Sequence, residues 1–332
     1  MRTFFGRIGF NGTREILLAG ACIVAILAFS AASPYFLTFD NGATVLRNSV
    51  ELLLVSLGMT LLLAMGSIDV SVGMVLGLCA IVVGRLLQAG VDPVLAGAAG
   101  PVAGALLGAI TASAVVLGRI PAIVGTLGLL GIYRAGIFLL LGGAWLSGLP
   151  SSLTDLLGAR IFGVPVSLLL IALAYLLVWL ALRRTPFGPH ILAIGNAEEK
   201  ARLSGVAVTR TRFATFIVSG LLCGVAASFY ISNYRNVEMT IGSALPLEAV
   251  AAVVLGGTSV MGGRCSLLGT VLGVVLLRLL QNGLLLIGVP SLWQTVVTGA
   301  LLLAVLGAEA AAGRLPKSFV LGASGPMSRA SR

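Results

Sequence analysis

The sequence predicts an all-α, polytopic membrane protein, a bundle of about ten spanning helices. Hydrophobic residues make up 58% of the 332 residues and charged residues only 10%, whereas soluble domains contain about 25% charged residues. The chain also divides into apolar stretches close to the roughly 20 residues that cross a bilayer. We place the spans at residues 16–32, 50–66, 70–89, 94–117, 122–142, 164–182, 213–231, 247–261 (a short one), 266–286 and 292–309.

These spans form one transmembrane domain over residues 16–309, between an N-terminal segment, 1–15, and a C-terminal tail, 310–332. Arg and Lys cluster before the first span, in the 183–212 loop after the sixth, and after the last. Positive loops are typically cytoplasmic, and an even number of spans separates neighbouring clusters. We therefore expect a multi-pass membrane protein with both termini in the cytoplasm. The net charge of +10 then reflects topology and attraction to anionic lipid, without a nucleic-acid partner.

Two segments 190 residues apart begin and end alike. GSIDVSVG, from Gly66, leads to RLLQAG, and GGTSVMGG, from Gly256, leads to RLLQNG. This is an internal repeat, and because an even number of spans lies between the third and the ninth, its copies run in parallel. The glycines coincide with small polar residues, a combination that predicts broken helices. Such breaks free backbone groups to face a polar cargo or cavity.

We expect the two breaks to lie at similar depth beside a translocation path. The side chains expected there are those of Asp69, Ser71, Thr258, Ser259 and, in the second RLLQ motif, Asn282; Gly256 and Gly257 give the backbone freedom. An alternative for Asp69 is a helix cap at the cytoplasmic interface.

Other charges and glycines have different expected roles. Arg134 and Arg278 lie within expected spans and are functional candidates by default. Glu51 and Arg85 lie nearer to expected span ends, where their side chains can reach the membrane surface. Gly100, Gly104 and Gly108, spaced four apart, are typical of a face along which two helices pack closely.

The cytoplasmic loop contains the signals of one short helix. We expect Asn196 to cap it, Glu198 and Glu199 to place negative charge in its first turn, and Ser204-Gly205 to end it. The flanking residues 186–195 and 206–212 are expected to be extended. A helix this short needs a partner surface, which is either another protein or its own bundle. Its predicted members are Asn196, Ala197, Glu198, Glu199, Ala201, Arg202, Ser204 and Gly205.

No catalytic site or metal site is predicted. A nucleotide-binding P-loop needs Gly-Lys followed by Ser or Thr, but the lysines are Lys200, after Glu199, and Lys317, after Pro316. The single histidine, His190, has no cluster of Cys or acidic ligands near it, and the four cysteines have no metal-binding spacing. We expect the cysteines to be small packing residues and the chain to need no cofactor of its own.

Four stretches in this order resemble the permease subunit of ribose-type ABC importers: GSIDVSVGMVLGL from Gly66, IPAIVGTLGLLGIYRAG from Ile120, AIGNAEEKARLSGV from Ala193, and EAVAAVVLGGTSVMGGRCSLLGTVLGVVLLRLLQNGL from Glu248. The resemblance runs from about residue 40 to residue 308. It implies import of a monosaccharide such as ribose, or of the furanose-like signal autoinducer-2.

The resemblance also implies a location in the bacterial inner membrane and a set of partners. Two permease subunits, identical or related, form the pathway; a separate ATPase with two nucleotide-binding domains binds ATP and Mg; and a periplasmic binding protein delivers the sugar. The short loop helix then resembles the coupling helix on which the ATPase docks, and transport follows alternating access. The alternatives are a permease of the same superfamily for nucleosides or branched-chain amino acids, and an ion-coupled secondary sugar carrier.

Overall fold

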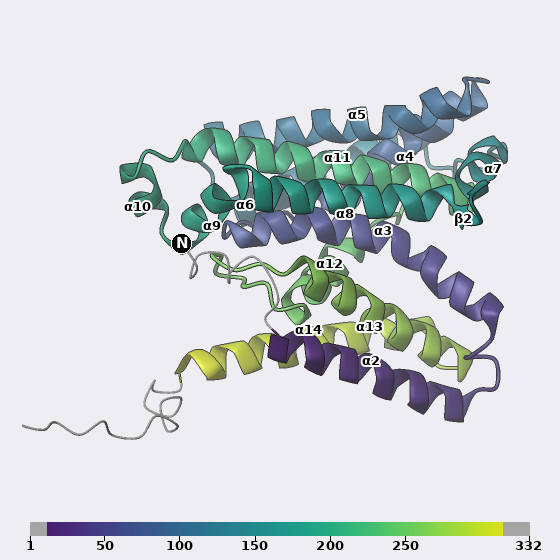
Figure 1. Cartoon of the computed structure of the whole chain (residues 1–332). Helices are drawn as coiled ribbons and strands as arrows, with labels where there is room; N and C mark the ends of the chain where they lie inside the picture. Colours follow the sequence, from purple (N-terminus) through teal and green to yellow (C-terminus); the bar gives the residue numbers. More distant parts are fainter. Residues whose placement is uncertain (1–11, 315–332) are drawn as a thin grey trace, which may run out of the picture.

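The computed structural model describes residues 12–314, and this part of the chain is nearly all helical. Figure 1 shows one elongated bundle. Its elements are α2 (Gly12–Ala32), α3 (Phe39–Ala64), α4 (Val72–Gln88), α5 (Pro93–Ala112), the π-helical η1 (Ser113–Leu117), α6 (Ala122–Leu141), α7 (Ser152–Gly158), β1 (Arg160–Ile161), β2 (Val164–Pro165), α8 (Val166–Arg184), α9 (Phe187–Asn196), α10 (Glu198–Leu203), α11 (Val208–Tyr234), α12 (Leu245–Leu255), α13 (Leu267–Leu286) and α14 (Ser291–Arg314).

Within residues 12–314, seven helices are long and apolar enough to cross a membrane: α2, α3, α5 with η1, α6, α8, α11 and α13. Two further apolar helices, α4 and α12, are shorter. The predicted eighth span, 247–261, is wrong in extent, because α12 ends at Leu255. Eleven residues rise only about 17 Å, about half of a hydrocarbon core of roughly 30 Å.

Helix α3 is the centre of the bundle. Every residue from Ser49 to Ala64 is buried, and α3 packs against α11 on one side and against α12 and α13 on the other. Figure 1 shows α5, α11 and α8 on one side of α3 and α2, α13 and α14 on the other. In contrast, α2, α6 and α8 expose large apolar side chains such as Leu17, Leu139 and Leu177. Central burial with an apolar exterior is the arrangement of an integral membrane protein.

Close helix packing uses the glycines that the sequence indicated. A Cβ added to Gly104 of α5 would lie 2.1 Å from the carbonyl oxygen of Gly220 on α11. One added to Gly100 would lie 2.6 Å from the Gly224 oxygen. The two backbones are therefore in direct contact, and the predicted packing role of these glycines is confirmed.

The two ends of the bundle differ. Helices α9 and α10 lie at one end, and α7 with the β1–β2 hairpin lies at the other (Figure 1). The prediction of extended chain over residues 186–195 is wrong, because α9 covers Phe187–Asn196. The hydroxyl of Thr185 accepts a hydrogen bond from the Phe187 N–H (3.2 Å), and Ile191, Leu192 and Ile194 are buried against the bundle. Tertiary packing, which local signals do not report, makes this segment helical.

Candidate translocation pathway and coupling site

The first glycine-rich segment is a loop between α3 and α4, as predicted. Gly66 adopts a positive φ of 74° just after α3. Asp69 is buried, and its Oδ1 accepts hydrogen bonds from the N–H (2.8 Å) and the hydroxyl (2.6 Å) of Ser71 at the start of α4. The Val70 N–H donates to Thr126 Oγ1 of α6 (3.2 Å). Asp69 thus closes a turn that leads into α4, whereas the N-cap position of α4 is Ser71, which makes no side-chain capping bond.

The second segment separates α12 from α13. Thr258 and Ser259 are buried, and Thr258 Oγ1 accepts a hydrogen bond from the Ser266 N–H (3.3 Å). Gly257 has a φ of 89°. A Cβ on Gly256 would lie 2.4 Å from the carbonyl carbon of Gly269 on α13. This break therefore depends on backbone shapes and contacts that larger residues would disturb.

The two breaks contact each other. The N–H of Gly263, in the second, donates to the carbonyl oxygen of Ala64, the last residue of α3 before the first (2.8 Å). Beside this bond, the hydroxyls of Thr60 on α3 and Thr270 on α13 are buried and lie 2.8 Å apart. Segments from the two halves of the sequence thus form one polar contact at the end of the bundle that carries α9.

The C-terminus of α9 packs directly onto this contact. A Cβ added to Gly195 would lie 2.1 Å from the Ala64 oxygen and 2.5 Å from the Gly263 nitrogen. A Cβ on Gly263 would in turn lie 2.4 Å from Asn196 Oδ1. A Cβ on Gly262 would lie 2.7 Å from the Cα and from the carbonyl oxygen of Gly195. We call the set Ala64, Gly195, Asn196, Gly262 and Gly263 the junction. Through the Gly195 backbone and the Asn196 side chain, it joins the loop of residues 183–212 to the end of α3 and to the second break.

The expected capping role of Asn196 is wrong. Asn196 ends α9, and its Nδ2 donates to the Leu192 carbonyl (2.8 Å). Ala197 is a single extended residue, and α10 begins at Glu198. The predicted end of the helix is confirmed, since Ser204 follows the last helical residue and Gly205 has a φ of 82°. Extended chain over 206–212 is also wrong, because α11 starts at Val208.

Helix α10 is exposed at the end of the bundle. Ala201 is its buried residue, whereas Leu203 is 80% exposed. Glu199 pairs with Arg202 within the helix (2.7 Å) and Glu198 pairs with Arg212 of α11 (2.8 Å). The helix thus presents an apolar tip and charged groups outward while it remains tied to α9 and α11. A short exposed helix of this kind is suited to docking in a partner.

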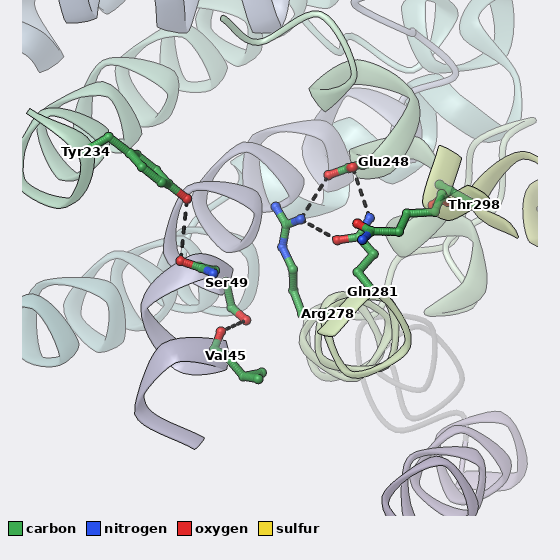
Figure 2. Close-up of polar contacts among 9 residues, drawn as sticks. Val45, Ser49, Tyr234, Glu248, Arg278, Gln281 and Thr298 are labelled. Carbon is green, nitrogen blue, oxygen red and sulfur yellow. Dashed lines mark hydrogen bonds and ion pairs between the residues drawn. The ribbon is translucent and has the colours of Figure 1, made fainter. Parts of the chain in front are cut away.

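A polar cavity of about 170 Å³ lies between α3, α11, α13 and α14, outside the two breaks. We call it the Arg278 cavity; its polar lining residues are Asn48, Tyr234, Arg278, Gln281, Asn282 and Gln294. Arg278 Nη1 lies 3.3 Å from Glu248 Oε2 of α12 and donates to Gln281 Oε1 (2.6 Å), and Gln281 Nε2 donates to Glu248 Oε1 (3.0 Å). Figure 2 shows this closed triangle of side chains.

Of the predicted pathway residues, Asn282 lines this cavity. Its side-chain amide exchanges two hydrogen bonds with Asn41 of α3 (2.9 and 3.0 Å). Asp69, Ser71, Thr258 and Ser259 do not line it, because they belong to the loops of the two breaks. The structure therefore divides the predicted set between two places.

Comparison with known proteins agrees with this architecture. The family described as the branched-chain amino acid transport system / permease component matches residues 41–306. The chain belongs to this permease family. No solved structure matches it.

Three relatives of the permease match over most of their length. An autoinducer 2 import system permease protein of Klebsiella pneumoniae is 40% identical over 88% of the chain and 85% of its own length. A ribose import permease protein of Bacillus subtilis is 37% identical over 90% and 94%. An autoinducer 2 import system permease protein of Escherichia coli K12 is 33% identical over 88% and 90%.

Glu51 of the permease corrects another expectation. The sequence predicts Glu51 near the end of a span. In the structure α3 begins at Phe39, so Glu51 lies well inside a helix, and it is buried. Its Oε1 accepts a hydrogen bond from Asn233 Nδ2 of α11 (2.8 Å). The polar residues before position 50 hid the first part of this helix from a hydropathy argument. Arg85, as expected, lies in the last turn of α4 and is exposed.

Two acidic residues of the permease were not singled out by sequence reasoning. Glu15 of α2 is buried and accepts a hydrogen bond from Ser266 Oγ (2.5 Å), beside the second break. Glu248 completes the triangle with Arg278 and Gln281. A carboxylate within an apolar helix, near an arginine in the next helix, is a signal that would have indicated the second pairing.

Proposed function

We propose that the chain is the transmembrane subunit of a binding-protein-dependent ABC importer that moves a monosaccharide, a ribose-like pentose or autoinducer-2, into the cytoplasm. The observation that carries this proposal is the match to import permeases for ribose and autoinducer 2 across 85–94% of their own length. The family match over residues 41–306 also spans the chain from near the beginning of α3 to beyond the end of α13.

We further propose that ten helices cross or enter the inner membrane, with α4 and α12 as the short members, and that both termini are cytoplasmic. The parallel repeat is supported by a shared detail. Arg85 donates to Gln88 (3.3 Å) in α4 as Arg278 donates to Gln281 (2.6 Å) in α13. A second permease copy, or a related chain, would complete the pathway.

In this proposal a separate ATPase with two nucleotide-binding domains binds ATP and Mg and docks on α10. Movement of α10 would reach the pathway through α9 and the junction, because the Gly195 backbone is in contact with Ala64 and Gly263. The periplasmic sugar-binding protein would dock at the opposite end, near α7 and the β1–β2 hairpin. ATP binding and hydrolysis then bias two states of the bundle.

The predicted pathway residues keep distinct proposed roles. Asp69, Ser71, Thr258 and Ser259, with Gly256 and Gly257, would hold the breaks in shape during the movement, because their hydrogen bonds and close approaches lie within the loops. Asn282 would face the solute, because it lines the Arg278 cavity.

A second candidate is import of a branched-chain amino acid, which the description of the matched family favours. An uptake assay distinguishes the two candidate functions. The permease is reconstituted with its cognate ATPase and binding protein in proteoliposomes that contain ATP, and uptake of labelled D-ribose, autoinducer-2, L-leucine and uridine is measured. We expect ATP-dependent uptake of D-ribose or autoinducer-2. Uptake of L-leucine or uridine with neither of the first two would refute the sugar assignment.

A further inference from the structure

The Arg278 cavity has polar side chains in its lining although it lies along a candidate membrane span, where burial of polar groups costs free energy. Arg278 lies within α13, a candidate membrane span. Ionisable groups at such depth face a protein interior or a water-filled space and are normally paired. Arg278 and Glu248 satisfy this rule, since their side chains are only 18% and 17% exposed and lie 3.3 Å apart. Their opposite charges compensate, so the pair gives the cavity no net charge.

Pairing does not use all of the hydrogen-bonding capacity around the cavity. Within residues 12–314, the buried Nε–H of Arg278 has no hydrogen-bond partner. The remaining polar lining groups are amides and one phenol, from Asn48, Gln281, Asn282, Gln294 and Tyr234. Each amide both donates and accepts, and the phenol does too. This is the set of partners that matches hydroxyl groups, which also donate and accept.

Size limits the occupant further. The cavity holds about 170 Å³, close to an engineered cavity of about 150 Å³ that binds benzene. A single small ring such as a pentose matches this volume, whereas a nucleoside or a disaccharide is considerably larger. A free amino acid fits by size, but its ammonium and carboxylate groups would need charged partners, and Arg278 and Glu248 already neutralise each other.

We propose that the Arg278 cavity is a solute-binding subsite of the permease that takes a neutral polyhydroxylated solute of monosaccharide size. The guanidinium of Arg278 and the amides of Asn48, Gln281 and Asn282 hydrogen-bond its hydroxyl groups, while Val45 and Leu285 contact its carbon skeleton. The Glu248–Arg278 pair orients the guanidinium, and the two charges of the pair cancel. This proposal rests on the proposed function and assigns the substrate class of the pathway to named side chains.

The test uses cysteine protection in the full complex with its ATPase and binding protein. Leu285 is 59% exposed and lines the cavity, so a charged methanethiosulfonate reagent should modify Leu285→Cys, because the thiolate that reacts forms only where water reaches the sulfur. Saturating D-ribose should slow this modification at least threefold, and L-leucine should not. The control is Phe162→Cys, fully exposed between β1 and β2, whose rate should not depend on D-ribose.

A second variant isolates the hydrogen bonds. Arg278→Lys keeps the positive charge opposite Glu248 but removes the planar guanidinium and its five N–H donors, so D-ribose protection of Leu285→Cys should be lost while the variant still inserts and binds the ATPase. Asn48→Leu should raise the D-ribose concentration for half-maximal protection about tenfold. If D-ribose is taken up with ATP but does not protect Leu285→Cys, the subsite is refuted and the proposed function stands. If D-ribose and autoinducer-2 are neither taken up nor protective, the subsite and the proposed function are both refuted.

Discussion

Replacement of Gly195 by alanine tests whether the junction transmits movement from the ATPase-docking loop to the breaks. The added methyl group would lie 2.1 Å from the Ala64 oxygen and 2.5 Å from the Gly263 nitrogen. Both are backbone atoms, so no side-chain rotation relieves the overlap. Overpacking of this kind costs about 1–3 kcal/mol, and loss of the 2.8 Å hydrogen bond between Gly263 and Ala64 adds about 1 kcal/mol.

Within a helix such as α9, alanine is more stable than glycine by about 0.5–1 kcal/mol, which offsets part of this cost. The net cost to the arrangement with an intact junction is therefore about 1–3 kcal/mol. A coupling energy of this size corresponds to about a 5–150-fold change. We therefore expect the ratio of sugar-stimulated to basal ATP hydrolysis to fall at least about fivefold in the reconstituted complex, with normal membrane insertion.

The matched control is Gly128→Ala in α6. Gly128 is exposed, and a Cβ there meets nothing within 4 Å, so this variant should keep the wild-type ratio. The reasoning is refuted if Gly195→Ala retains wild-type stimulation in a complex that contains stoichiometric ATPase. Co-purification of the ATPase with both variants checks that assembly is unaffected.

Three further predictions concern topology, docking and packing. In intact cells, a membrane-impermeant maleimide should label Ser151→Cys and not Thr209→Cys, both exposed, and inverted vesicles should give the reverse; the opposite pattern at both sites would overturn the orientation. Leu203→Glu, at the exposed tip of α10, should reduce ATPase co-purification at least tenfold, whereas the control Phe162→Glu, exposed between β1 and β2 at the opposite end of the bundle, should leave it unchanged. Wild-type recovery of the ATPase with Leu203→Glu would show that α10 is not the docking element. Gly104→Leu should prevent accumulation of folded permease, because its Cβ meets the Gly220 oxygen at 2.1 Å, whereas Gly128→Leu should be tolerated; equal yields in detergent-solubilised membranes would contradict the packing argument.

The helices and their breaks could largely be predicted from sequence, because they depend on local composition. Long apolar runs indicated the positions of α2, α5, α6, α8, α11 and α13, and the glycine cluster from Gly66 indicated where the chain leaves α3. The cluster from Gly256 indicated a break, but the predicted span 247–261 ran past the end of α12 at Leu255. The beginning of α3 was not predictable in this way. Its first ten residues include Asp40, Asn41 and Asn48, whose low hydropathy is typical of a loop. They nevertheless lie in the helix, and the side chain of Asn41 donates a hydrogen bond to Asn282.

The site could be predicted only in part, because its contacts join distant segments. Glycine content indicated Gly256, Gly257 and Gly263 as special, but not that Gly263 bonds Ala64 or that Gly195 packs on both. The capping signals around residues 196–205 predicted one helix that begins at Asn196. In the structure, Ile191 and Leu192 are buried within a second helix, α9, which ends at Asn196. Tertiary packing outweighed the local capping signal there.

The energy source of uptake tests the central claim most directly. Proteoliposomes containing the permease, its ATPase and its binding protein are loaded with ATP, ion gradients are collapsed with ionophores, and accumulation of labelled D-ribose and autoinducer-2 is followed. An ATP-driven importer should accumulate one of these solutes above the external concentration, and omission of ATP, of the ATPase or of the binding protein should abolish accumulation. Accumulation by the permease alone, driven by a proton or sodium gradient without ATP, would contradict the account.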